Sequence, residues 1–219
     1  MTNKQYSTVL FDWDGTLAKS MHLLVKAFKT VLIRQGLMFT DKQIINDTFG
    51  NWLEGLKFWG VADPESTVVM IKQELDDSME KLELYPGVGE TLARLVKRGK
   101  QLAVIALGGV TRSDILRGLT WGSESEVRPL AVFTDRELPW QKPNPLILQR
   151  AAELLGGRKA DSLWVGNSLN DWEMGRAAKI DTVIFYPPEN EKFGQNRVMD
   201  QEVGARVIRE FKELLKVVV

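Results

Sequence analysis

Short unbroken runs of apolar residues recur along the chain, and between them lie longer segments with an apolar residue at every third or fourth position. An unbroken run of about four to eight apolar residues is typical of a strand that is buried on both faces, as in a parallel sheet. An apolar residue at every third or fourth position is typical of an amphipathic helix. The first pattern predicts five strands, at residues 7–12, 101–106, 130–134, 162–165 and 182–186.

The second pattern predicts helices between these strands. Four of them each precede a predicted strand, at 87–98, 112–120, 145–155 and 171–178, and an amphipathic segment at 201–217 is predicted to close the chain as a helix. Regular alternation of strand and helix favours a doubly wound α/β domain, in which right-handed crossovers place helices on both faces of a parallel sheet.

The interval between the first predicted strand and Pro86 breaks this alternation. It has no strand pattern but contains several amphipathic stretches, among them residues 21–34 and 65–84. A crossover between parallel strands needs only one helix, so we interpret the interval as an insertion. The sequence therefore predicts an all-helical second domain over residues 19–85, with residues 1–18 and 86–219 forming the α/β domain.

Composition limits the chemistry that such a protein can perform. The 219 residues include no cysteine and only one histidine, His22, which excludes disulfides, cysteine-ligated metals, a cysteine nucleophile and a pair of histidine ligands. Lys plus Arg number 29, as do Asp plus Glu, and this balance gives no general attraction for nucleic acid or an anionic membrane. No apolar stretch has the length of a signal peptide or a membrane span. We therefore expect a cytoplasmic protein that binds neither nucleic acid nor membrane.

The first predicted strand ends in an acidic motif. Asp12, Trp13, Asp14, Gly15 and Thr16 follow one another at its carboxyl end, where open α/β sheets bind their ligands. Like charges repel, so two carboxylates one residue apart call for a nearby cation or a raised pKa on one of them. Taken alone, an Asp-Gly turn after a strand would explain the motif about as well.

Two later loops are predicted to bring polar side chains to the same edge of the sheet. Lys142 lies in the loop before a helix that Asn144 can cap, with Pro145 at the first helical position. The segment 166–171 follows the fourth predicted strand and contains Asn167 and Asp171. Oxygen ligands beside one lysine suit Mg²⁺-assisted phosphoryl transfer, because the metal and the lysine neutralise the phosphate while a carboxylate attacks it.

At this point the sequence resembles the haloacid dehalogenase (HAD) superfamily of phosphotransferases. The segments that carry the resemblance are FDWDGTL at 11–17, the helix and strand at 84–106, KPNP at 142–145 and VGNSLNDWEMGRAA at 165–178. The helical insertion resembles the cap of the phosphoglycolate phosphatase and β-phosphoglucomutase branch. The resemblance implies a Rossmann-like core with an inserted all-helical cap domain, and the hydrolysis of a small phosphorylated metabolite.

The resemblance also implies a role for the residues of these motifs. Asp12 would be the nucleophile that forms an aspartyl phosphate, and Asp14 would protonate the leaving alkoxide and then activate water. Lys142 would bind the phosphoryl group, and Gly15 and Thr16 would complete the phosphate-binding loop. The ligands implied for Mg²⁺ are Asp12, the backbone carbonyl of Asp14, Asn167 and Asp171.

Two positions depart from the pattern of the superfamily. The second motif has Ser or Thr at the end of the second strand, but this chain has Ala106, so the backbone N–H groups of Gly108 and Gly109 are expected to bind phosphate instead. The fourth motif has Asn167 where the superfamily has an acid, which removes one negative charge from the metal site. Both changes bear on catalytic rate more than on fold.

Alternatives to a phosphatase stay open. These are a phosphomutase of the β-phosphoglucomutase kind, a transferase that uses another acceptor, and a catalytically weakened protein with a binding or regulatory role. Dehalogenation itself is disfavoured, because it has no leaving alkoxide for Asp14 to protonate. Packing is the favoured role for His22, and Trp13 and the cap aromatics Trp52, Phe58 and Trp59 are assigned to packing or to substrate contact. The sequence is compatible with a monomer and with a homodimer.

Overall fold

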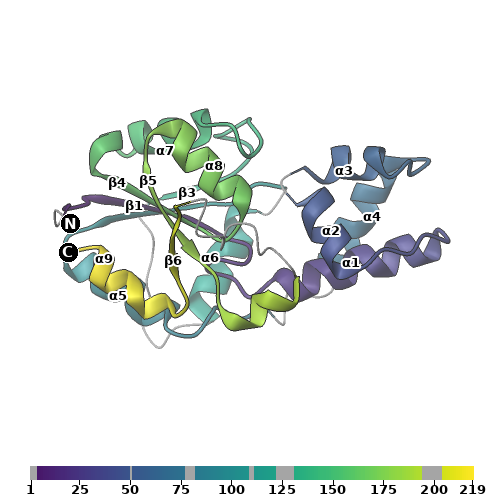
Figure 1. The fold of residues 1–219 in the computed structure, drawn as a ribbon, viewed down its shortest axis with the longest axis horizontal. Helices are drawn as coiled ribbons and strands as arrows, with labels where there is room; N and C mark the ends of the chain where they lie inside the picture. Colours follow the sequence, from purple (N-terminus) through teal and green to yellow (C-terminus); the bar gives the residue numbers. More distant parts are fainter. Residues whose placement is uncertain (1–3, 50, 77–81, 109–110, 122–130, 194–203) are drawn as a thin grey trace.

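The computed structural model describes the chain except for residues 1–3, 50, 77–81, 109–110, 122–130 and 194–203. A parallel sheet of six strands, in the order β3-β2-β1-β4-β5-β6, forms the centre of the molecule, and a helical insertion lies to one side of it (Figure 1). The strands are β1 Thr8–Asp12, β2 Gln101–Ile105, β3 Ala131–Phe133, β4 Ser162–Gly166, β5 Asp181–Phe185 and β6 Arg206–Ile208. The predicted fold class, a Rossmann-like α/β core, is confirmed.

Strand β1 lies in the middle of the sheet, between β2 and β4. All five of its residues are buried, which explains why its sequence is an unbroken apolar run up to Asp12. Asp12 pairs with Ile105 of β2, and Phe11 pairs with Val165 of β4, so the loops after these three strands begin at the same level. The strand order reverses beside β1, and this switch point is where open α/β sheets bind ligands.

Helices cover both faces of the sheet. Helices α5 and α6 pack on one face, and α7 and α8 pack on the other. Each lies within two residues of the segment predicted for it: α5 Val88–Lys97, α6 Arg112–Trp121, α7 Leu146–Leu154 and α8 Leu169–Ala178. Among the residues that the structure describes, we find no helix with the length and apolar character needed to cross a membrane.

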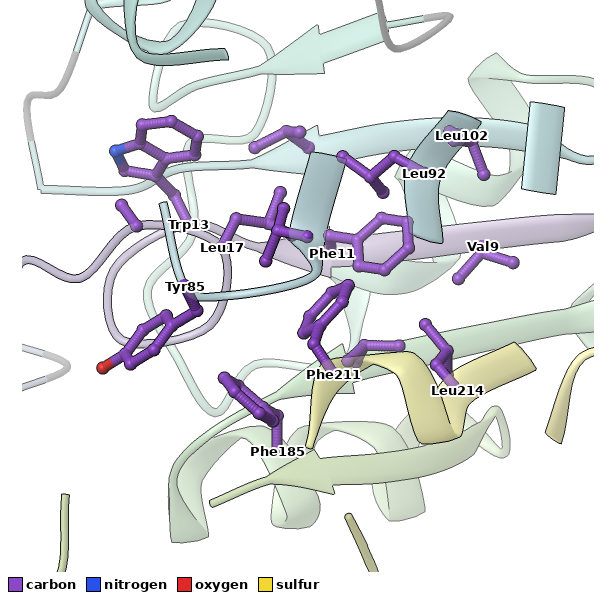
Figure 2. Packing of buried hydrophobic residues seen from close by; sticks show 14 of the residues in the cluster. Val9, Phe11, Trp13, Leu17, Tyr85, Leu92, Leu102, Phe185, Phe211 and Leu214 are labelled. Carbon is purple, nitrogen blue, oxygen red and sulfur yellow. The ribbon is translucent and has the colours of Figure 1, made fainter. Parts of the chain in front are cut away.

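Successive side chains of β1 enter different cores. Leu10 packs under α7 and α8, whereas Phe11 belongs to the core on the α5 side. There the rings of Phe11 and Phe185 lie against Phe211, with centroids 6.1 and 5.1 Å away (Figure 2). Trp13 is fully buried in the same core (Figure 2). Of the two roles considered for Trp13, packing and substrate contact, its burial supports packing.

The insertion between β1 and α5 has a core of its own. Its helices are α1 Met21–Arg34, α2 Asp41–Thr48, α3 Trp52–Phe58 and α4 Pro64–Asp76. Their buried side chains gather around Phe28, whose ring meets that of Trp52 edge-on with centroids 5.2 Å apart. The predicted helix over residues 21–34 is confirmed at both ends. The insertion therefore has a hydrophobic core that is separate from the two cores against the sheet.

Two short segments join the insertion to the sheet and run side by side. Ala18 and Leu84 form an isolated antiparallel bridge, and the backbone N–H of Lys19 donates to the carbonyl of Glu83 at 2.8 Å. The predicted helix over 65–84 is therefore wrong at its end: residues 82–84 are not helical, and residues 77–81 lie outside the described residues. The limits of the two domains stay a prediction.

The C-terminal segment is not the amphipathic helix predicted over 201–217. Residues 201–203 lie outside the described residues, and Arg206–Ile208 forms β6, which pairs in parallel with β5. A 3₁₀ turn, Phe211–Glu213, and a single helical turn, α9 Leu214–Val217, follow it. Ile208 enters the core on the α5 side, whereas Val207 packs near Tyr186. This two-residue alternation belongs to a strand, and it was hidden within a segment whose apolar spacing also fits a helix.

Candidate active site

The predicted nucleophile loop turns sharply after β1. Gly15 has a φ of 76°, and its N–H donates to the carbonyl of Ala18 at 2.9 Å. A Cβ atom at this position would collide with the Asn167 side chain. The positive φ and the close approach both explain why glycine follows Asp14. The N–H of Thr16 also donates within the loop, to the carbonyl of Trp13 at 3.3 Å.

Asp12 is held at the floor of the site by hydrogen bonds to both carboxylate oxygens. Lys142 Nζ lies 2.6 Å from Oδ1, and Thr16 Oγ1 donates to Oδ2 at 3.3 Å. Burial raises the pKa of Asp12 to about 7; Lys142 opposes this rise, and the Asp171 and Asp14 carboxylates add to it. The structure thus places a buried carboxylate beside a fixed ammonium, as the sequence predicted.

Lys142 is positioned by three groups. Besides Asp12, its Nζ lies 2.7 Å from Asp171 Oδ1 and 5.3 Å from the centre of the Trp164 ring. Burial lowers the pKa of Lys142, but the two carboxylates outweigh this and raise it above its usual value, so the side chain stays charged. Asn144 Oδ1 accepts a hydrogen bond from the N–H of Leu146 at 3.0 Å, but Pro145, and not Asn144, is the N-cap residue of α7, so the helix begins one residue later than predicted.

Asp14 lies across the loop from Asp12 and has a different environment. It is half-buried, and Ser20 Oγ donates a hydrogen bond to its Oδ1 at 2.6 Å. Burial raises the pKa of Asp14, while the Ser20 hydrogen bond and Lys142 work against this rise. Ser20 is the N-cap residue of α1, yet its side chain makes no capping bond. Ser20 was not predicted as a site residue, because a serine before a helix normally indicates a cap.

Asp171 organises the loop after β4. Its Oδ2 accepts hydrogen bonds from the N–H groups of Asn167 and Ser168 at 3.1 and 3.0 Å and from Ser168 Oγ at 2.6 Å. Its Oδ1 faces Lys142. Asp171 is fully buried; its Oδ2 accepts all of these hydrogen bonds, and its Oδ1 accepts none but lies at ion-pair distance from Lys142. This arrangement makes Asp171 a residue that positions Lys142 and Asn167, and its predicted role as a metal ligand stays a prediction.

Asn167 occupies the place where a cation would meet the β1 loop. When its side-chain amide is oriented by its hydrogen bonds, the nitrogen donates to Asp12 Oδ2 and to the backbone oxygen of Asp14, both at 3.2 Å. Two oxygen atoms therefore converge on one positively polarised group. A rotation of the amide would add a third oxygen to the pair.

This donor set fits Mg²⁺, which prefers oxygen ligands. Within the described part of the chain, no group of three His, Cys, Asp or Glu side chains is arranged to hold a metal ion. A cation at this place would therefore depend on one carboxylate, one backbone carbonyl and one side-chain amide. Such a set carries a single negative charge, so we expect a weaker site than one with two or more carboxylates.

The predicted phosphate donors after β2 are less available than expected. The N–H of Gly108 donates to both carboxylate oxygens of Asp135, at 3.2 and 3.1 Å, and Gly109 lies outside the described residues. Ala106 is buried, and its N–H donates a hydrogen bond to the carbonyl of Phe133. Phosphate binding by Gly108 stays a prediction, and it requires the bond to Asp135 to break.

A cavity of about 470 Å³ opens above these residues, between the sheet and the insertion. Asp12, Asp14, Lys142, Asn167 and Asp171 all line it. His22 and Trp13 do not, and Trp52 is the one cap aromatic of the predicted three that does, since Phe58 is exposed and Trp59 stacks on Phe39. The insertion lines the cavity with Met21, Leu24, Phe49, Asn51, Trp52, Leu53, Val68 and Lys72.

Comparison with known families agrees with the geometry of this site. The model of the haloacid dehalogenase-like hydrolase family matches residues 9–185, which include both the β1 loop and the loop after β4. The chain belongs to this family. The resemblance noted in the sequence is thereby confirmed.

Curated members of the family match over nearly the whole chain. A phosphoglycolate phosphatase of Nitrosococcus oceani is 28% identical, over 90% of this chain and 88% of its own length. The pyrophosphatase PpaX of Halalkalibacterium halodurans is also 28% identical, over 98% and 97% of the two chains. Two enzymes with different named substrates thus show the same level of similarity, so identity alone does not select a substrate.

Solved structures of family members share the fold. A putative haloacid dehalogenase-like hydrolase from Bacteroides fragilis has a TM-score of 0.80 at 24% identity, covering 96% of this chain and all of the other. CbbY from Rhodobacter sphaeroides, in complex with phosphate, has a TM-score of 0.73 at 19% identity, with 96% of each chain covered. The insertion and the sheet are therefore arranged here as they are in other members of the family.

One contact between the insertion and the site was also missed by sequence analysis. Asn170 Nδ2, at the start of α8, donates to the backbone carbonyl of Phe49 at 3.1 Å. Asn170 is adjacent to Asp171, so this hydrogen bond joins the insertion directly to the loop that positions Lys142. Because the acceptor is a backbone carbonyl, which every residue has, the identity of residue 49 gives no indication of this contact.

Proposed function

We propose that the protein is a phosphatase that hydrolyses a small phosphate monoester through an aspartyl phosphate on Asp12. The observation that carries the proposal is the buried Asp12 carboxylate 2.6 Å from the Lys142 ammonium, at the floor of a cavity that Asp14 also lines. An unshielded carboxylate would repel a phosphate dianion, and a fixed ammonium offsets this repulsion. Relatives named phosphoglycolate phosphatase and pyrophosphatase support the same chemistry.

Each step assigns one task to a residue of this chain. An oxygen of Asp12 attacks phosphorus, the ester P–O bond breaks, and Asp14 gives its proton to the leaving alkoxide. Asp14, now a carboxylate, takes a proton from water, which attacks the phosphorus of the aspartyl phosphate and releases inorganic phosphate and Asp12. Burial raises the pKa of Asp14, which favours the protonated form that the first step needs. Lys142 neutralises the phosphoryl oxygens in both steps.

The proposed cofactor is Mg²⁺, held by Asp12, the backbone oxygen of Asp14 and the side-chain oxygen of Asn167 after its amide rotates. When bound, it would neutralise charge on the phosphoryl oxygens. The insertion closes the cavity over the site, and Asn170 holds it there through Phe49. Closure excludes bulk water and leaves no room for a macromolecular substrate.

The decisive experiment measures the hydrolysis of p-nitrophenyl phosphate with and without Mg²⁺, for the wild type and for Asp12→Asn. We expect Mg²⁺-dependent turnover that Asp12→Asn lowers at least about a thousandfold, because the nucleophile is lost. Trapping the phosphoenzyme at acid pH identifies the intermediate. Wild-type turnover no higher than that of Asp12→Asn, on this ester and on a panel of sugar phosphates and phosphoglycolate, would refute the proposal.

A second candidate, a weakened protein with a binding role, is favoured by Ala106 and Asn167. The two positions are tested by Ala106→Thr, which restores a hydroxyl after β2, and by Asn167→Asp, which restores a carboxylate. A gain of about tenfold or more in kcat for either variant, the value of one hydrogen bond to a charged group, would show that the natural chain is a slowed enzyme. An inactive wild type that both changes activate would favour the binding role.

A further inference from the structure

The part of the cavity wall that comes from the insertion is mainly apolar. Leu24 of α1, Leu53 of α3 and Val68 of α4 line it, together with Phe49 and Trp52. On the side of the sheet, the wall continues with Leu107, Pro139 and Trp140. Glycolate and pyrophosphate are small and hydrophilic, so they would leave this apolar surface without a partner. A leaving group with an apolar body would cover it and gain free energy from the burial.

The size of the cavity supports the same conclusion. Its volume of about 470 Å³ lies within the range of pockets that enclose whole organic ligands, roughly 300 to 1,000 Å³. A phosphoryl group fills only the floor, next to Asp12 and Lys142. Residues of α3 and α4 line the cavity together with the loops at its floor, so a leaving group large enough to fill it would contact these helices.

One cation stands on this apolar wall. Lys72 of α4 lines the cavity and is half-buried, and among the residues that the structure describes it has no acidic partner at ion-pair distance. Two other lysines of the insertion differ from Lys72 in this respect. Lys29 forms an ion pair with Asp41, and Lys26 is exposed to solvent and does not line the cavity. The other charged residue of the wall beyond the catalytic group, Asp135, belongs to the loop after β3, and its carboxylate accepts from Gly108.

We infer that the substrate is a phosphomonoester of an apolar, aromatic-sized alcohol or phenol that carries a second anionic group, and that Lys72 binds this second anion. The phosphoryl group lies at Asp12 and Lys142, the apolar body lies against Phe49, Leu53 and Val68, and the distal anion lies at Lys72. This inference rests on the proposed phosphatase function, and it names the substrate class of the same site. It assigns specificity to α3 and α4 of the insertion.

The kinetic test compares two esters that differ only in the distal anion, phenyl phosphate and 4-carboxyphenyl phosphate. The wild type is expected to turn over both with higher kcat/KM than phosphoglycolate or pyrophosphate. Lys72→Met is expected to lower kcat/KM about fivefold for the carboxylated ester, through KM, and less than about twofold for phenyl phosphate, because one partly exposed ion pair is lost. Lys26→Met removes a cap charge outside the cavity and is the matched control, expected to leave both values unchanged.

The apolar wall is tested separately with Leu53→Asn. This change is expected to raise KM for both aryl esters alike, while phosphoglycolate is unaffected. Higher kcat/KM for phosphoglycolate or pyrophosphate than for the aryl esters would overturn the apolar body. An equal loss for both aryl esters in Lys72→Met would overturn the role of Lys72.

A binding measurement keeps the two proposals apart. Phenylphosphonate and 4-carboxyphenylphosphonate cannot be hydrolysed, and their affinities for the wild type and for Lys72→Met can be measured by calorimetry in the presence of Mg²⁺. Tighter binding of the carboxylated compound, lost in Lys72→Met, supports the inference even if no ester is turned over, in which case only the phosphatase proposal fails. Equal affinities for the two compounds refute the inference, and Asp12-dependent hydrolysis of phenyl phosphate would still support a phosphatase.

Discussion

Ser20 Oγ lies 2.6 Å from Asp14 Oδ1, and this hydrogen bond joins the first residue before α1 to the proposed general acid. Ser20 thereby gives up the capping role that its position would allow. The helix that begins there belongs to the insertion, so a hydroxyl at the start of the insertion lowers the pKa of Asp14.

Ser20→Ala should move the pH profile of the enzyme. The hydroxyl lowers the pKa of Asp14 against the rise caused by burial, so its loss should raise that pKa further, because a hydrogen bond to the charged carboxylate is removed. The alkaline limb of kcat/KM for p-nitrophenyl phosphate should then shift to higher pH. Ser20→Thr keeps the hydroxyl and should keep the profile. An unshifted limb in Ser20→Ala would contradict this role.

Asn167→Asp should strengthen Mg²⁺ binding and weaken the metal-free protein. The amide nitrogen donates to Asp12 Oδ2 and to the Asp14 carbonyl, and a carboxylate there would repel both oxygens. We expect the free energy of unfolding in EDTA to fall by about 2 kcal/mol. Calorimetric titration should show a lower Kd for Mg²⁺ than in the wild type.

The control for this variant is Asn46→Asp, which adds the same charge at an exposed position of α2. It should change neither the Kd for Mg²⁺ nor the stability in EDTA. Equal Mg²⁺ affinity in the wild type and in Asn167→Asp would show that residue 167 does not contact the metal.

The stability of the metal-free protein should depend on the protonation of Asp12. Burial raises the pKa of Asp12 from the ordinary value of 3.8 to about 7 in the folded state, so the folded protein binds a proton more tightly than the unfolded chain does. Stability from this group is complete below about pH 4 and is lost as the pH rises to about 7, at up to about 1.4 kcal/mol per pH unit. The Asp12→Asn variant has no ionisable side chain at this position, so it lacks this pH dependence of stability.

Urea unfolding in EDTA at a series of pH values measures this difference. The stability of the wild type relative to Asp12→Asn should fall between about pH 4 and about pH 7 and then become constant. A difference that stays constant from pH 4 to pH 8, or that grows in the opposite direction, would show that Asp12 is charged over the whole range.

Phe211→Ala should destabilise the protein even though the residue does not line the cavity. Phe211 is buried, and its ring contacts those of Phe11 and Phe185 (Figure 2). Loss of a buried phenylalanine costs about 3 to 5 kcal/mol, measured by chemical denaturation. Phe58→Ala, at a side chain that is 80% exposed, is the matched control and should change stability by less than about 0.5 kcal/mol. Similar losses in both variants would contradict the assigned core.

The sheet was largely predictable, because strands buried on both faces leave unbroken apolar runs. β6 was not, since it has three residues, one of them the exposed Arg206, and among the described strands it pairs with β5 alone. The motifs correctly predicted that Asp12, Lys142 and Asp171 lie at one edge of the sheet, because the parallel strands before them end side by side. Ser20, Asn170 and Lys72 were missed, because their importance depends on how the insertion sits over the sheet, and no local pattern records that placement.

The hydrogen bond from Asn170 to the Phe49 carbonyl has a consequence for movement of the insertion. Any movement of the insertion away from the sheet would have to break that bond. The neighbouring Asp171 forms an ion pair with Lys142 through its own carboxylate. The Lys142 ammonium would therefore stay in place when the insertion moves. Asp12, Lys142 and Asp171 all lie outside the insertion, so their ion pairs would persist in a protein whose insertion had moved.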